Sequence, residues 1–256
     1  MRISRKRQGQ IMLARLYHTH HSRHMEDLPF WLDLARQQGG PILELGCGSG
    51  RVTLPVVEAG YKVVGLDHNP EMLDYLRERL SPPVGDRLRL SQADMTAFDL
   101  GKRFPLILLP CNTYSAFGAN QRRSLLDCVR RHLSLQGLFA ASLPNPNLLR
   151  RLPRTSDPEV EESFPHPLDG EPVQVSSGWE RSAGRLTVTW HYDHLLPDGS
   201  VERLSMQASH DLAPAQAHLA EIEAAGLRLA DTFGDFDRSP FTPQSPLMIF
   251  IAAPQP

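Results

Sequence analysis

The sequence predicts an α/β fold with a mostly parallel sheet flanked by helices, and three stretches carry this prediction. The first is an apolar run at residues 42–45 that leads into a glycine-rich turn and a helix-compatible segment. The second is a glycine-bounded stretch at residues 61–66 that ends in Asp67. The third, residues 104–109, is continuously apolar, which is typical of a strand buried on both faces of a parallel sheet.

The glycine-rich turn indicates a nucleotide-like ligand. A strand, a glycine turn and a helix N-terminus together bring backbone close to such a ligand. Glycine suits Gly46, Gly48 and Gly50 because a side chain would block the ligand and because tight turns often need a positive φ. Asp67 follows Gly46 by 21 residues, and an acidic residue about 20 residues on is placed to accept hydrogen bonds from ribose hydroxyls.

The spacing of the glycines is G-x-G-x-G and differs from the G-x-G-x-x-G of dinucleotide-binding folds. Glu44, inside the same turn, would repel a phosphate but suits a ligand that carries an ammonium and a sulfonium. A nicotinamide-dependent oxidoreductase would use the same strand, turn and helix, and it stays as a disfavoured alternative.

Two motifs give the chain a family resemblance. L-E-L-G-C-G-S-G-R at residues 43–51 and G-L-D-H-N-P-E-M-L at residues 65–73 resemble the first two motifs of class I S-adenosylmethionine-dependent methyltransferases. The resemblance extends less sharply over residues 17–253. It implies S-adenosyl-L-methionine as cofactor and a Rossmann-like, seven-stranded sheet of order 3-2-1-4-5-7-6 with strand 7 antiparallel.

The resemblance also implies roles for single residues. His68 and Met72 would flank the adenine, Asp94 would accept its exocyclic amine, and the Met95 amide would reach a ring nitrogen. Met72 could instead be core packing, and Asp94 could cap a helix from Thr96 onward. The full set of cofactor-binding candidates is Tyr17, Glu44, Gly46, Cys47, Gly48, Arg51, Asp67, His68, Met72, Asp94, Met95 and Pro110.

Composition narrows the class of protein. The chain has 256 residues, is 41% hydrophobic and 22% charged, and carries a formal net charge of -2. This charge gives no global field for nucleic acid or an anionic membrane, so neither partner is expected. Three cysteines without C-x-x-C pairing favour a reducing compartment, and we expect a cytoplasmic protein. Residues 1–7 are basic without a following apolar segment, and we interpret them as a solvated arm and not as a secretory signal.

The segment before the first strand reads as helical cover over residues 11–38. Tyr17 is a candidate to close over cofactor and substrate, because similar methyltransferases use a tyrosine of their N-terminal segment in this way. Asp27 is placed as the N-cap of the next helix. His20 and His24 have a spacing that could hold a metal on one helical face, but the sequence offers no obvious third ligand, and no metal is predicted.

The remaining core elements follow in order. Asn69 is a good N-cap for a helix over residues 70–80. A strand at 87–90, a helix at 119–133 and a strand at 137–143 come next. After an insertion, a helix at 213–225 and strands at 227–233 and 247–252 close the fold.

The insertion lies between the fifth strand and this last helix. Residues 150–170 are polar and read as an irregular connection. Strand-like alternation at 173–175, 185–195 and 201–210 predicts a three-stranded antiparallel sheet. We therefore expect a core of residues 1–147 and 212–256, including a helical cover at 1–39, and an inserted sheet at 148–211 that serves as a substrate cap.

The end of the fourth predicted strand is the place to search for acceptor chemistry. The (Asp/Asn/Ser)-Pro-Pro-(Tyr/Phe) tetrad of enzymes that methylate exocyclic amines of bases is absent at Pro110-Cys111-Asn112-Thr113. Pro110-Cys111 resembles the Pro-Cys of cytosine-C5 methyltransferases, whose cysteine attacks the base. Their partner motifs are not recognisable, so a nucleic-acid methyltransferase is a weak alternative.

The predicted function is transfer of a methyl group from S-adenosyl-L-methionine to a small-molecule amine or hydroxyl by in-line positioning. An unprotonated amine needs no dedicated base, whereas a hydroxyl does; His191, His194 and Tyr114 have the right chemistry. A non-catalytic S-adenosylmethionine-binding protein is the other alternative. The sequence does not distinguish a monomer from a homodimer.

Overall fold

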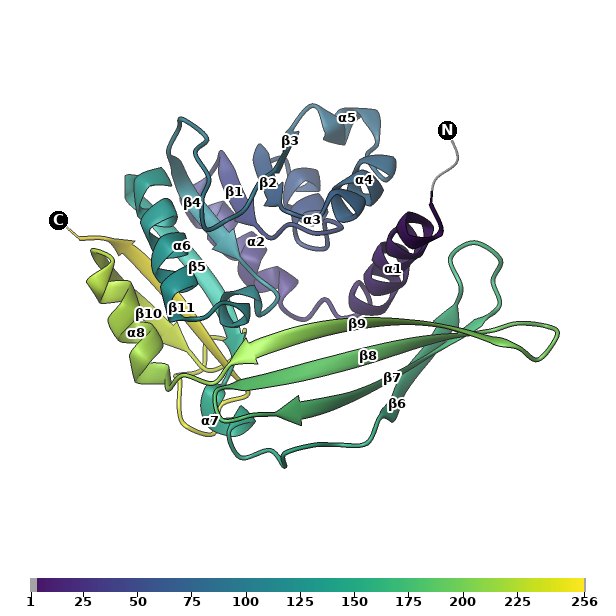
Figure 1. Cartoon of the computed structure of the whole chain (residues 1–256). Coiled ribbons are helices and arrows are strands. Elements are labelled where there is room, and N and C mark those ends of the chain that lie inside the picture. The colour runs from purple at the N-terminus through teal and green to yellow at the C-terminus, as the bar shows by residue number, and fades with distance from the viewer. Residues whose placement is uncertain (1–3, 256) are drawn as a thin grey trace. The chain divides into compact units, whose positions relative to one another are not determined.

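The computed structural model describes residues 4–255 and divides the chain into two compact units, whose elements are labelled in Figure 1. The core unit contains Met25–Arg151 and the chain from Asp211 onward. The sheet unit contains the chain up to His24 and Leu152–His210. The first helix is thus grouped with the inserted sheet, whereas the sequence analysis grouped residues 1–39 with the core.

The core unit is built on one seven-stranded sheet of order β10-β11-β5-β4-β1-β2-β3. β11 is antiparallel to both of its neighbours, and the pairs among β5, β4, β1, β2 and β3 are parallel. With β10 and β11 as the sixth and seventh strands, this confirms the predicted order and the antiparallel last strand. The strands are β1 (Ile42–Leu45), β2 (Val63–Asp67), β3 (Leu88–Gln92), β4 (Phe104–Leu109), β5 (Leu133–Pro144), β10 (Leu227–Phe233) and β11 (Leu247–Pro254).

Two hydrophobic clusters cover the two faces of this sheet. Ile42 packs in a cluster with Trp31 and Val56, whereas the next residue, Leu43, packs in a cluster with Leu125. The two neighbours belong to different clusters because successive strand residues point to opposite faces of the sheet. The helices of the core unit are α2 (Leu28–Gln38), α3 (Thr53–Glu58), α4 (Pro70–Glu78), α5 (Pro82–Gly85), η1 (Thr113–Ala116), α6 (Ala119–His132), α7 (Pro146–Leu149) and α8 (Ala215–Ala224).

The predicted start of α4 is confirmed in detail. The side chain of Asn69 accepts hydrogen bonds from the backbone amides of Glu71 at 2.9 Å and Met72 at 3.1 Å. These bonds satisfy two of the amides that have no partner within the helix. Capping by Asn69 therefore fixes the point where the chain leaves β2 and turns into α4.

The sheet unit contains a four-stranded sheet of order β6-β7-β8-β9, with one strand more than predicted. Its elements are α1 (Arg5–His21), β6 (Glu159–Pro165), β7 (Pro172–Arg181), β8 (Arg185–Leu195) and β9 (Val201–Asp211). The expectation of an irregular connection over residues 150–170 is wrong at β6, where the chain forms a strand. Phe164 is the one buried side chain of β6, so this edge strand shows little hydrophobic alternation in the sequence.

The start of the chain also differs from the expected solvated arm. α1 begins at Arg5, and the Ser4 hydroxyl accepts a hydrogen bond from the Arg7 amide as an N-cap. Residues 1–3 of that predicted arm lie outside the described residues. Farther along α1, Leu16 packs with Phe164, Val175 and other side chains of the inserted sheet, so the helix and the sheet share a small core.

Candidate cofactor site

The turn between β1 and α3 has the backbone that the sequence indicated. Gly46 and Gly48 adopt φ values of 67° and 51°, in the left-handed region that favours glycine. A Cβ at Gly46 would lie 3.2 Å from the Met95 Cε and 3.4 Å from the Thr113 Cγ2. Side chains from two other loops thus approach the turn, and a substitution at Gly46 would be crowded as well as strained.

Asp67 lies beside this turn at the end of β2. Its Oδ2 accepts a hydrogen bond from the Gly48 amide at 2.8 Å, and its Oδ1 accepts one from the Asn69 amide at 2.9 Å. A carboxylate has about four lone-pair sites. Asp67 therefore joins the glycine turn to the start of α4 and keeps acceptor capacity for a ligand hydroxyl.

Glu44 is buried in β1, with 2% of its surface exposed. Its Oε2 accepts a hydrogen bond from the Thr53 hydroxyl at 2.6 Å. Burial raises the pKa of Glu44 from 4.5 to about 8, against the opposing effects of this hydrogen bond and of Arg51. At neutral pH the Glu44 carboxyl is therefore mainly protonated, and a nearby cation would favour its ionised form.

Asp94 and Met95 follow β3 at the same edge of the sheet. Oδ1 of Asp94 accepts hydrogen bonds from both the amide and the hydroxyl of Thr96, each at 2.8 Å, and these bonds lower the pKa of Asp94. The expected helix from Thr96 onward is wrong, because the chain forms a turn there. Both bonds end at Oδ1, so the turn does not use the lone pairs of Oδ2. Met95 is buried.

The other candidates from the two motifs divide between surface and core. His68 is exposed over 79% of its side chain, with its Nδ1 3.6 Å from the Asp67 Oδ1. Met72 and Cys47 are buried, and a Cβ at Gly65 would lie 2.9 Å from the Cys47 Sγ. Only the backbone of Cys47 is thus part of the turn, where its amide donates to the Leu66 carbonyl.

Arg51 and Asp27 form a pair that the sequence did not reveal. Both Asp27 oxygens accept hydrogen bonds from the Arg51 guanidinium at 2.6 Å, and Asp27 also accepts from the Trp31 indole at 2.8 Å. Asp27 is the N-cap residue of α2, as expected, but its side chain makes no capping hydrogen bond because Arg51 and Trp31 engage it. Residues 24 positions apart carry no local pattern that would have predicted this contact.

The loop after β4 holds Pro110 and Cys111. The Pro110 carbonyl accepts hydrogen bonds from the amide and hydroxyl of Thr113. Cys111 has a φ of 60°, and the Arg51 guanidinium donates to its Sγ at 3.0 Å. Desolvation of the sulfur raises the pKa of the Cys111 thiol, although the Arg51 guanidinium opposes this effect. A protonated thiol does not match the activated nucleophile of a cytosine-C5 methyltransferase.

The three candidate bases and Tyr17 lie in separate surroundings. Tyr114, in the core unit, is fully buried against His218 and Phe250, and burial raises its pKa. In the sheet unit, His191 contacts the Ser205 hydroxyl at 2.8 Å. His194 instead stacks on His166 with ring centroids 3.9 Å apart. Tyr17 packs edge-on against His21 in the same unit.

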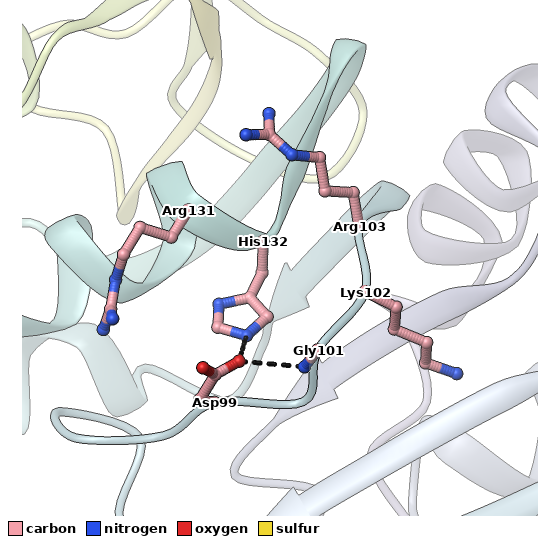
Figure 2. Close-up of a pocket in the computed structure, with 6 residues that line it drawn as sticks. All are labelled: Asp99, Gly101, Lys102, Arg103, Arg131 and His132. Carbon is pink, nitrogen blue, oxygen red and sulfur yellow. Dashed lines mark hydrogen bonds and ion pairs between the residues drawn. The ribbon is translucent and has the colours of Figure 1, made fainter.

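A hollow of about 280 Å³ lies elsewhere on the core unit. Figure 2 shows its lining residues, which come from the end of α6 and the segment before β4; Asp99 accepts from the Gly101 amide and approaches His132. These segments precede β4 and β5, whereas the glycine turn and Asp67 follow β1 and β2. The hollow is therefore at the opposite edge of the parallel sheet from the candidate cofactor site.

Comparisons with known proteins agree with this fold. Residues 42–137 match the family model described as a methyltransferase domain. The cypemycin N-terminal methyltransferase of a Streptomyces species is 25% identical over 219 residues, which cover 83% of this chain and 82% of that protein.

Two solved structures share the fold over nearly the whole chain. The CcbJ methyltransferase from Streptomyces caelestis superposes with a TM-score of 0.73 at 23% identity and covers 90% of both chains. The sugar N-methyltransferase KedS8 from a Streptoalloteichus species has a TM-score of 0.72 at 20% identity and covers 94% of this chain and 92% of its own.

The fold, the methyltransferase domain and the site confirm the class predicted from the two motifs. Residues 42–137 form a methyltransferase domain, and the chain has the fold of class I methyltransferases; together these findings support an enzyme that uses S-adenosyl-L-methionine as its methyl donor. Within residues 4–255, no helix is long and apolar enough to cross a membrane.

Proposed function

We propose that the chain methylates an amine nitrogen of a small molecule. The observation that carries this proposal is that Tyr114, the candidate base in the segment that follows β4, is fully buried and therefore not available to an acceptor hydroxyl. A hydroxyl acceptor needs a base near the transferred methyl, whereas an unprotonated amine needs only to be held in line with the sulfonium. The names of the cypemycin N-terminal methyltransferase and of the sugar N-methyltransferase KedS8 point in the same direction.

The donor would be held by the groups around the glycine turn. Asp67 would accept from the ribose hydroxyls with its remaining lone pairs, and Oδ2 of Asp94 would accept from the adenine amine. Met72, Met95 and the exposed ring of His68 would border the adenine. Gly46, Gly48, the Cys47 backbone and the Pro110 turn would leave room for the donor.

Glu44 and Arg51 would act on the charged end of the donor. The ammonium of S-adenosylmethionine would stabilise the ionised form of Glu44, which is otherwise protonated because of its burial. Arg51 would favour the carboxylate through its positive charge while its guanidinium stays paired with Asp27. We keep Tyr17 as the residue that would close over the bound donor.

The sheet unit would supply acceptor specificity, and Trp179 on β7 and Trp190 on β8 are apolar groups with a polar tip. A net charge of -2 favours a small acceptor over nucleic acid. Three free cysteines in the described chain, one of them exposed, suit a reducing, cytoplasmic location.

A screen with labelled methyl donor tests the amine. Panels of primary and secondary amines and of matched alcohols would be incubated with the wild type and with a Gly46→Val variant as a donor-binding control. We expect label in amines only, with a rate that rises with pH as the amine loses its proton. Label in the alcohols would contradict the proposal.

A further inference from the structure

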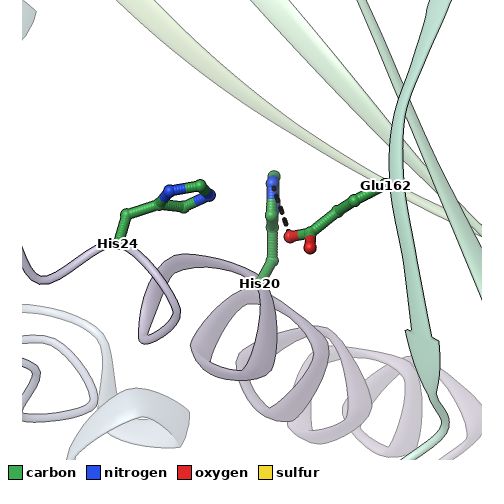
Figure 3. A group of neighbouring side chains, drawn as sticks. All are labelled: His20, His24 and Glu162. Carbon is green, nitrogen blue, oxygen red and sulfur yellow. Dashed lines mark ion pairs between the residues drawn. The ribbon is translucent and has the colours of Figure 1, made fainter.

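We propose that His20, His24 and Glu162 form a binding site for a divalent transition-metal ion, with Zn²⁺ as the best match. Figure 3 shows His20 on α1, His24 in the turn after α1 and Glu162 on β6. One ligand atom from each side chain lies within 4.8 Å of the other two. All three residues belong to the sheet unit, and they play no part in the proposed donor site.

The distances are close to those of a metal site. The Nε2 of His20 lies 3.7 Å from the Glu162 Oε1. Two ligand atoms on a tetrahedral Zn²⁺, each about 2.1 Å from the ion, are about 3.4 Å apart. His24 is exposed and follows the end of the helix, and its ligand atom lies within 4.8 Å of those of His20 and Glu162.

The Glu162 carboxylate gives support for a bound cation that is independent of these distances. Its Oε1 is buried and accepts no hydrogen bond from the described residues. The other oxygen, Oε2, lies 3.2 Å from the Arg23 guanidinium. Arg23 thus occupies one side of the carboxylate and leaves the atom that faces His20 for a cation, which would offset the cost of burying that oxygen.

His20 has the second contact that orients metal-binding histidines. Its Nδ1 lies 3.2 Å from the Tyr192 hydroxyl, on the side opposite the Nε2 that faces the acidic residues. In metal sites the second ring nitrogen almost always contacts a fixed polar group, which sets the tautomer.

The charges around the site are net negative and favour a cation. Oε2 of Glu161 lies 3.1 Å from the His20 Nε2 and adds a second carboxylate, whereas Arg23 adds one positive charge. The Glu161 carboxylate would accept a hydrogen bond from a water molecule on the metal, or would in part take the place of Glu162 as a ligand. Two imidazoles and a carboxylate suit Zn²⁺, and thiolate-seeking or all-oxygen ions fit this set less well.

The metal would fasten the end of α1 to the edge strand β6. His24 and Glu162 are 138 positions apart in the chain, and a cross-link between distant segments restricts the unfolded state. Three protein ligands leave a fourth position for water, as in zinc sites that are not purely structural.

Calorimetric titration of the tag-free, chelator-treated full chain with ZnCl₂ tests the site, with the visible spectrum of bound Co²⁺ as a second readout. We expect one Zn²⁺ per chain and a loss of at least about tenfold in affinity for His24→Ala and for Glu162→Gln. Because His24 is exposed, we expect His24→Ala to fold, and circular dichroism checks this. His191→Ala is the matched control, since His191 lies on β8 next to Tyr192 and outside the site.

A second group of possible metal ligands is His166, Asp169 and His194, whose ligand atoms also lie within 4.8 Å of one another. The test must therefore distinguish binding at this group from binding at the proposed site. Absence of stoichiometric binding overturns the proposal. So does binding that folded His24→Ala and Glu162→Gln leave unchanged, and so does binding that is lost in His194→Ala but kept in His24→Ala. None of these results depends on methyl transfer, so a failure here is separate from a failure of the proposed function.

Discussion

Glu44→Gln is the perturbation whose effect the structure defines most closely. Burial raises the pKa of Glu44 from 4.5 to about 8 in the folded protein. Between these values the unfolded chain has released the proton and the folded chain still holds it, so stability falls as pH rises. At about 1.4 kcal/mol per pKa unit, the wild type loses about 3 kcal/mol by pH 7 and about 5 kcal/mol by pH 9 relative to acid pH.

Glutamine removes this penalty because it is neutral at every pH and its amide oxygen still accepts from Thr53. We expect Glu44→Gln to be close to the wild type near pH 4.5 and more stable by about 5 kcal/mol near pH 9. Urea unfolding of both proteins at several pH values, followed by tryptophan fluorescence, measures the difference. Glu223→Gln on exposed surface is the control.

If the free energies of unfolding of the wild type and Glu44→Gln change in the same way with pH, the raised pKa of Glu44 in the folded protein is contradicted. The same titration bears on the donor site. If an ammonium lies against Glu44, S-adenosylhomocysteine should bind the wild type more tightly as pH rises toward about 8, and this dependence should vanish in Glu44→Gln.

Three further substitutions have defined outcomes. Asp67→Ala should weaken S-adenosylhomocysteine binding about tenfold or more in a calorimetric titration, because hydrogen bonds to a charged acceptor are lost; an unchanged dissociation constant in a folded variant would remove Asp67 from the ribose role. Arg122→Met should lower the free energy of unfolding by about 3–5 kcal/mol in urea, because it leaves the Glu221 carboxylate without its buried partner; a change below about 1 kcal/mol would contradict this. Cys111→Ser should keep the methyl-transfer rate, since the thiol is protonated; a covalent adduct in the wild type that the variant lacks would contradict this.

The features that the sequence predicted well are those with local signals. The apolar runs, the glycine turn and Asp67 each lie within a few residues of the pattern that identifies them, and the strand order followed from the family resemblance. Asn69 capped its helix as expected, since a cap is set by its own neighbouring amides.

The features that the sequence missed depend on contacts between distant segments. Asp27 is the N-cap residue of α2, as the sequence predicted, but the sequence did not show that Arg51 and Trp31 engage its carboxylate. β6 is an edge strand with mostly exposed side chains, and such a strand lacks the alternation on which the prediction relies. The burial of Tyr114 and the approach of Glu162 to His20 and His24 likewise arise only when the chain is folded.

The central claim is the methyl donor, and calorimetric titration with S-adenosylhomocysteine, with NAD and NADP in parallel, tests it most directly. We expect micromolar, one-to-one binding of S-adenosylhomocysteine and no heat from either nicotinamide cofactor. Binding of NAD or NADP instead, or the absence of binding by S-adenosylhomocysteine, would contradict it.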